Sequence, residues 1–254
     1  MTTIVIRASE SAHWYAQDGS PAYTVLAKNG SPRPTTLRDA RGRGYVPSVT
    51  TVMQCAAKPA LEAWKQKQML LAALTLPKIS QETEQQFIDR IVLDSKETGK
   101  QAAARGTAVH EAIERSFTEE AGHSPTIEAF HRSVKEHFGD HKWAVETSFC
   151  SPLGYGGKLD LHTSGIVLDT KTKEFGPGDV VDGYDEHAMQ LAAYRMGLEM
   201  PAARCANVFV SVSHPGLICV KEWTEEELQR GWNMFRSLLA YWQFKSKYMI
   251  GESK

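Results

Sequence analysis

The chain has 254 residues, of which 42% are hydrophobic and 23% charged, with a formal net charge of −1. These values are ordinary for a soluble globular protein, and any phosphate binding would need a local basic patch rather than the field of the whole molecule. The cysteines are widely spaced and form no CxxC pair, which disfavours a zinc site or an iron–sulfur cluster. No apolar run approaches the ~20 residues of a membrane span, and the first residues resemble no targeting peptide, so we expect a cytoplasmic protein.

Residues 1–44 are polar and rich in turn-forming residues, with short β-like runs at 4–6 and 23–27. The part from 30 to 44 contains four arginines and two prolines and predicts a loop or mobile arm. Its arginines could bind phosphates, or it could be a solvated loop. We expect an N-terminal arm or hairpin region over 1–44, followed by one domain over 45–254.

From residue 49 the apolar pattern becomes helical. Helices are expected at 60–74, 82–94, 96–117 and 127–138. In the third, Val109, Ile113 and Phe117 recur every fourth residue and predict a buried stripe. Candidate core positions of the first helix are Leu61, Trp64, Met69 and Leu71.

The second half alternates strand and helix patterns. We expect strands at 143–149, 207–213 and 217–223, a hairpin over 158–171, and a helix over 185–200 that Pro201 ends. The last helix opens with a capping box formed by Thr224 and Glu227. This order predicts a single α/β or α+β domain.

The hairpin is the most informative segment. With Ser164-Gly165 as its turn, residue 161 faces 168, and Asp160 faces Asp169. The leucines and Ile166 then share a core face, while Asp160, Asp169 and Lys171 share the other face. Carboxylates directly opposed at about 4.5–5.5 Å between Cβ atoms repel each other, so we expect a cation between them, from Lys171 or from a divalent metal. The alternative is an ordinary exposed hairpin whose carboxylates face water.

Four motifs resemble one superfamily. Gly157-Lys-Leu-Asp160 followed by Asp169-Thr-Lys171 resembles the PD-(D/E)XK nuclease core, with Asp169 where many members carry Glu. Three further segments resemble its RecB-type branch, which includes phage exonucleases and the mitochondrial genome maintenance exonuclease; they are Arg105–His110, Gln190–Tyr194, and Pro47-Ser-Val-Thr50 with the segment from Lys58. The resemblance implies a restriction-endonuclease-like core with a mixed central sheet flanked by helices and with helical N-terminal additions.

The resemblance also implies a metal centre. Asp160, Asp169 and the backbone carbonyl of Thr170 would bind Mg²⁺ or Mn²⁺, and Lys171 would lie beside the attacking water. His110 would complete a second metal position, so that two ions are expected.

Two residues, His110 and Glu146, each have a second interpretation without a role at a metal. His110 could instead be a helix-surface histidine that pairs with Glu114. Glu146 could hold a metal-bound water or be a solvated strand residue.

Substrate contacts are expected from Gln190, Tyr194, Arg105 and Ser48. Gln190 and Tyr194 share a helix face and could support Lys171 or touch a phosphate. Tyr194 could also be a core residue with a satisfied hydroxyl. In the N-terminal arm, Trp14 and Tyr15 are expected to be freer to contact a nucleic-acid strand.

The implied function is divalent-metal-dependent exonuclease action on DNA, at a single strand or a duplex end. It would belong to phage-type recombination, repair or replication, in a bacterium or phage-infected cell, with a single-strand annealing or binding protein as partner. The alternatives are a structure-specific endonuclease of the same superfamily and a catalytically silent nucleic-acid-binding module. Neither an iron–sulfur cluster nor a nucleotide is expected, since the sequence has no Gly-x4-Gly-Lys-[Ser/Thr] motif.

Overall fold

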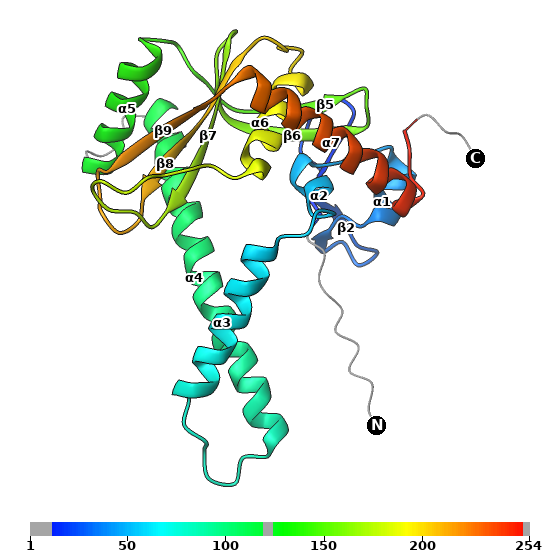
Figure 1. Cartoon of the computed structure of the whole chain (residues 1–254). Coiled ribbons are helices and arrows are strands. Elements are labelled where there is room, and N and C mark those ends of the chain that lie inside the picture. The colour runs from blue at the N-terminus through cyan, green and yellow to red at the C-terminus, as the bar shows by residue number, and fades with distance from the viewer. Residues whose placement is uncertain (1–11, 119–123, 251–254) are drawn as a thin grey trace. The chain divides into compact units, whose positions relative to one another are not determined.

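The computed structural model describes residues 12–118 and 124–250 (Figure 1). The chain forms two compact units, one from residues 1–55 with 124–254 and the other from 56–123. Each unit has its own secondary structure and packing. The strand expected at 4–6 lies outside the described residues, and a single nuclease domain over 45–254 stays a prediction.

The unit of residues 56–123 contains a pair of packed helices, α3 (Pro59–Thr75) and α4 (Glu84–Thr118). The two helices expected at 82–94 and 96–117 are one continuous helix, because no proline separates them and a glycine at position 99 does not stop a helix. At that glycine the ring of Trp64 lies against α4, where a Cβ would come within 3.6 Å of it.

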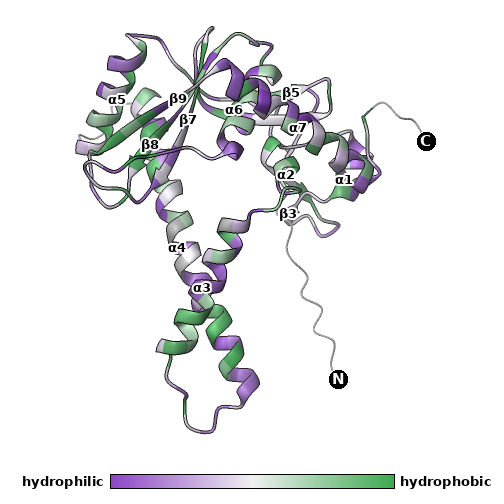
Figure 2. Ribbon diagram, in the orientation of Figure 1, coloured by the Kyte–Doolittle hydropathy of each residue, from purple (hydrophilic) through white to green (hydrophobic). Residues whose placement is uncertain are grey.

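The apolar residues of α3 and α4, green in Figure 2, are only partly covered. Of the expected stripe, Ile113 is buried, whereas Val109 and Phe117 are only half-buried. The four candidate core residues of α3 are exposed, contrary to expectation, because one partner helix covers only one stripe of another; they are Leu61, Trp64, Met69 and Leu71.

A mixed five-stranded sheet forms the centre of the other unit. Its strand order is β5-β6-β7-β8-β9. The strands are β5 (Ala144–Ser151), β6 (Tyr155–His162), β7 (Ile166–Lys173), β8 (Arg204–Ser211) and β9 (Ile218–Trp223). Neighbouring strands are antiparallel except β7 and β8, which are parallel and therefore need a crossover.

Three helices flank this sheet: α5 (Pro125–Phe138), α6 (Asp185–Gly197) and α7 (Glu225–Ser246). Helix α6 is the crossover between β7 and β8, and α7 begins with the expected capping box of Thr224 and Glu227. The expected α+β fold, a mixed central sheet flanked by helices, is confirmed. Within the described ranges, no helix combines the length and the apolar character that a bilayer crossing requires.

The hairpin of β6 and β7 has the expected register. Leu161 pairs with Leu168 and His162 with Val167. However, Val167 is as fully buried as Leu168, and Asp169 is only 3% exposed. A central strand beside a parallel partner is covered on both faces, so the alternative of an ordinary exposed hairpin with its carboxylates in water is wrong.

The N-terminal residues form small elements rather than a loop. These are β1 (Trp14–Tyr15), β2 (Thr24–Leu26), β3 (Pro32–Pro34), α1 (Leu37–Arg43), β4 (Val46–Pro47) and α2 (Val49–Met53). The strand expected at 23–27 is confirmed as β2, but the loop expected over 30–44 is wrong. Thr36 and Asp39 form a capping box there, and Arg33 makes a two-pronged ion pair with Asp39. Trp14 and Tyr15 are buried rather than free.

Close packing of α6 and α7 depends on Gly231. A Cβ at this position would lie 2.9 Å from backbone atoms of Ala188 and Met189, which cannot rotate away. We expect Gly231→Ala to lower the free energy of unfolding by about 1–3 kcal/mol because the helices must separate. Urea denaturation measures this, with Gly42→Ala as control: Gly42 lies in α1 with nothing near its missing Cβ, so the helix should gain about 0.5–1 kcal/mol. Equal stability of Gly231→Ala and wild type would contradict the packing.

Candidate active site

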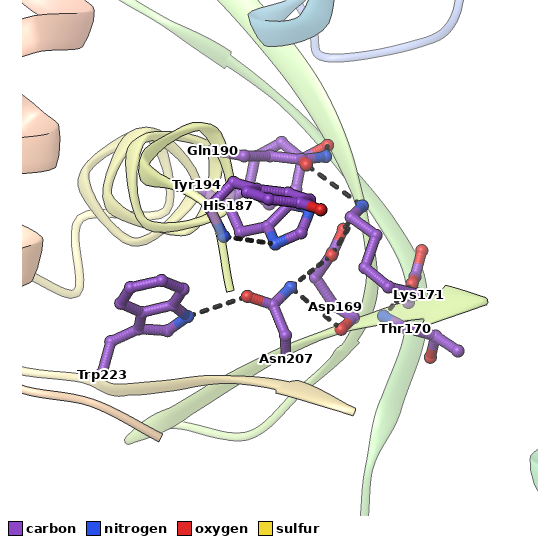
Figure 3. Close-up of polar contacts among 10 residues, drawn as sticks. Asp169, Thr170, Lys171, His187, Gln190, Tyr194, Asn207 and Trp223 are labelled. Atoms are coloured by element: carbon purple, nitrogen blue, oxygen red, sulfur yellow. Dashed lines mark hydrogen bonds and ion pairs between the residues drawn. The ribbon is translucent and has the colours of Figure 1, made fainter. Parts of the chain in front are cut away.

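The site is built around Asp169 and Lys171, two residues apart on β7 (Figure 3). The Lys171 ammonium lies 2.9 Å from Oδ1 and 2.7 Å from Oδ2 of Asp169. It also donates to the Gln190 side-chain oxygen of α6 at 3.2 Å. An ion pair of this kind offsets the cost of burying the Asp169 carboxylate. The expectation that Lys171 neutralises the acidic side of the hairpin and that Gln190 supports it agrees with these contacts.

Asp160 lies at the point where β6 and β7 separate. The paired residues end at Leu161 and Leu168, so the backbone of β7 beyond them is not paired with β6 in the ordinary way. The Thr170 N–H donates instead to Asp160 Oδ2 at 2.7 Å. The Asp160 carboxylate is therefore held against the backbone between Asp169 and Lys171, and the structure brings the predicted triad together.

Two residues that the motifs do not contain complete the surroundings of Asp169. Asn207 of β8 is fully buried, pairs with Asp169 across the parallel strands, and donates to Asp169 Oδ2 at 2.7 Å. The indole N–H of Trp223 donates to the Asn207 side-chain oxygen at 2.8 Å. Both ends of the Asn207 amide are thus used, which fixes its orientation and that of Asp169. One signal in the sequence was available: a lone asparagine followed by apolar residues in a strand expected to be buried.

Tyr194 is a core residue whose hydroxyl is satisfied. It accepts a hydrogen bond from the Gln190 amide at 2.8 Å, and its ring meets Phe149 edge to face. Burial, and next the negative charge of Asp169, raise the pKa of the Tyr194 phenol, which stays protonated. This favours the core alternative over contact with a nucleic acid, while Tyr194 holds Gln190 and thereby Lys171.

Glu146 occupies the position on β5 across from Asp160. Its neighbours Val145 and Thr147 pair with Leu161 and Leu159 on β6. Its backbone is left-handed, with φ of 53°, a conformation that costs energy in a non-glycine residue and occurs at functional sites. Its carboxylate forms an ion pair with Lys158. Glu146 is therefore an ion-paired residue beside the site rather than a plain solvated strand residue. Its role at a metal-bound water stays a prediction.

The remaining predicted residues are Ser48, Arg105 and His110. Ser48 is buried, and its hydroxyl accepts from the Thr51 N–H as the N-cap of α2, so it serves the fold. Arg105 and His110 lie on α4, in the unit of residues 56–123. Their roles at a phosphate and a second metal stay predictions.

The donor atoms suit a hard divalent cation. Two carboxylates, of Asp160 and Asp169, and the carbonyl of Thr170 are all oxygen ligands, and Mg²⁺ commonly takes one or two carboxylates and keeps several waters. A Lys171 ammonium already bridged to Asp169 shows that this point of the fold requires positive charge. Among the described residues no group of three His, Cys, Asp or Glu side chains gathers as a metal cage. The residues present fit one such ion held largely by water.

His187, on the first turn of α6, gives the fold a pH dependence. Burial, and next the charge of Lys171, lower its pKa to about 4, below the ordinary value of 6.5. Between those values the unfolded chain binds a proton that the folded chain does not, so stability present above pH 6.5 is lost as the pH falls. We expect a loss of about 1–2 kcal/mol after solvent screening. Thermal unfolding from pH 7 to 4 should show a smaller loss in His187→Gln, whose amide can still accept the Tyr184 N–H; equal losses would contradict this.

Comparisons with known proteins give no family for the chain. No protein-family model and no curated protein matches it. The solved structures that match include one described as the crystal structure of SSO0001, with 14% identity and a TM-score of 0.29. The match covers 70% of this chain and 86% of that one. A likeness at this level carries no argument, so fold and site stand on the geometry described above.

Proposed function

We propose that the chain is a divalent-metal-dependent exonuclease that hydrolyses phosphodiester bonds at DNA ends. One observation carries this proposal: the Lys171 ammonium is held between the buried Asp169 carboxylate and Gln190. A second carboxylate, of Asp160, accepts a hydrogen bond from the Thr170 N–H, between Asp169 and Lys171. Such an arrangement places negative oxygen ligands and a positive hydrogen-bond donor around one point, as hydrolysis of a phosphodiester requires.

Each residue has a distinct role in this proposal. Asp160 and Asp169, with the Thr170 carbonyl, would hold Mg²⁺ or Mn²⁺, and the bound ion would polarise the phosphoryl oxygen and offset its developing charge. Lys171 donates a hydrogen bond to the attacking water and stabilises the hydroxide form in line with phosphorus. Gln190, held by Tyr194, keeps the ammonium at that position.

The choice of DNA ends as the substrate rests on the resemblance to RecB-type and phage exonucleases. With it come the expected use in recombination, repair or replication, the partnership with a single-strand annealing or binding protein, and a second ion at His110. An endonuclease of the same superfamily and a silent binding module would share part of the site and are separated by experiment.

The test is digestion of end-labelled linear DNA and circular single-stranded DNA with Mg²⁺, beside Asp169→Ala. We expect the wild type to shorten linear DNA from its ends and leave the circle intact, and the variant to be inactive. Cleavage of the circle would identify an endonuclease. Binding without cleavage under Mg²⁺ or Mn²⁺ would identify a silent module, and full activity of Asp169→Ala would move the active site elsewhere.

A further inference from the structure

A stacked pair of aromatic side chains, of which one is exposed, lies near the start of the described chain. The imidazole of His13 stacks on the ring of Tyr23, with centroids 4.6 Å apart and planes inclined by 28°. His13 is exposed and Tyr23 is half-buried. The two rings come from either side of the turn between β1 and β2, so the fold, rather than sequence proximity, brings them together.

Hydroxyl contacts connect this pair to the candidate active site. The Tyr23 hydroxyl lies 2.7 Å from that of Tyr15. The Tyr15 ring rests on Gly156 of β6, where a Cβ would come within 2.8 Å of it. Gly156 precedes Asp160 by four residues on the same strand, a span of about 13 Å at the usual strand rise. Tyr15 therefore packs on the same strand that carries Asp160.

The shifted pKa values of the buried tyrosines also indicate that Tyr15 lies near the candidate active site. Burial is the largest cause that raises the pKa of Tyr15, followed by the Tyr23 hydrogen bond and the Tyr194 hydroxyl. Tyr194 in turn feels the charges of Asp169 and Asp160. Tyr15 is therefore in direct contact with Tyr23 and lies within electrostatic range of Tyr194 beside the carboxylates.

We propose that the stacked His13 and Tyr23 rings are a platform for an unpaired nucleobase of the DNA. This inference rests on the proposed function and deepens it by naming the substrate class as a single-stranded end. A base inside a duplex has both faces covered by its neighbours, whereas an unpaired base can stack on an aromatic side chain. Such stacking tolerates any sequence, as an exonuclease needs.

The test uses a fluorescein-labelled oligodeoxythymidylate bound to the full chain in Ca²⁺, measured by fluorescence anisotropy. We expect His13→Ala to weaken binding about 5- to 150-fold, the range found for one base–aromatic stack. His13→Phe should keep the wild-type affinity, because it retains the ring and loses the charge. Tyr241→Ala, which removes an exposed aromatic ring of α7, is the control and should change nothing.

A second readout reports stacking directly. An oligonucleotide with one 2-aminopurine near its end should lose fluorescence on binding to wild type and His13→Phe, and should not on binding to His13→Ala. Since His13 is exposed, these variants leave the core intact. Unchanged affinity and quenching in His13→Ala would overturn the platform, and loss of binding in His13→Phe would assign His13 to a phosphate instead.

The outcomes separate this inference from the proposed function. If the protein cleaves DNA but His13→Ala changes neither binding nor quenching, the proposed nuclease activity stands and the platform is overturned. Ring-dependent binding with no cleavage under Mg²⁺ or Mn²⁺ would support the platform and overturn the nuclease.

Discussion

Lys171→Met is expected to lower the turnover number for DNA hydrolysis about 10²- to 10⁴-fold, the contribution of a positioned proton-transfer or water-orienting group. The methionine fills similar space but cannot donate to water, to Asp169 or to Gln190. Binding of DNA in Ca²⁺ should change much less, because phosphate affinity comes from several groups. Single-turnover digestion of an end-labelled strand gives the rate, and anisotropy gives the affinity.

The same variant should also change stability in a metal-dependent way. Without Lys171 the Asp169 carboxylate stays buried beside Asn207 and lacks its cation, so the metal-free protein should unfold more easily than wild type. Added Mg²⁺ should then raise the melting temperature of Lys171→Met more than that of wild type.

Lys173→Met is the matched control for both measurements. Lys173 lies two residues farther on the same strand, but its ammonium lies over the Tyr184 ring and near the Asp182 carbonyl. Its loss should leave turnover within about tenfold of wild type, below the contribution of a positioned catalytic group. Equal losses in the two variants would mean that Lys171 acts only as one of several surface charges.

The register of the β6–β7 hairpin could be predicted because its information is local. A two-residue turn and strict alternation determine that Leu161 faces Leu168, and the structure has this pair. The expected facing of Asp160 and Asp169 is not formed as a strand pair, because the pairing ends at Leu161 and Leu168 and Asp160 accepts from the Thr170 N–H instead. The burial of the site could not be predicted in this way, since it depends on β8 and α6, which are placed by a crossover of variable geometry.

The errors at the N-terminus and in α4 concern local signals that were given the wrong weight. Prolines and arginines over 30–44 favoured a loop, although the capping box of Thr36 and Asp39 and the Arg33–Asp39 ion pair join residues only three and six apart and stabilise α1. The helices expected at 82–94 and 96–117 are one, because no proline interrupts α4 and Gly99 alone does not end it. In both places the helix-forming residues outweigh the turn-forming or helix-breaking ones.

Asn207 could not be assigned to the site from the sequence, because its contact with Asp169 depends on the parallel pairing of β7 and β8. Its amide joins the Trp223 indole to Asp169, and all three residues are buried. Asn207→Leu keeps the volume but leaves the indole N–H without an acceptor and Asp169 Oδ2 without this donor. We expect the free energy of unfolding to fall by roughly 2–4 kcal/mol, the sum of two buried groups left unsatisfied.

If Asn207 only stabilises the fold, the lower stability is the whole effect of the substitution. If Asn207 also orients Asp169, the substitution should weaken metal binding as well. Groups that orient a metal ligand typically affect metal affinity or activity by about 10- to 100-fold. We therefore expect the Mg²⁺ concentration for half-maximal digestion to rise about tenfold or more in Asn207→Leu, measured at a temperature where the variant is folded. Asn233→Leu, on the exposed side of α7, should change neither quantity. A less stable Asn207→Leu with the wild-type Mg²⁺ requirement would show that Asp169 keeps its orientation through Lys171 alone.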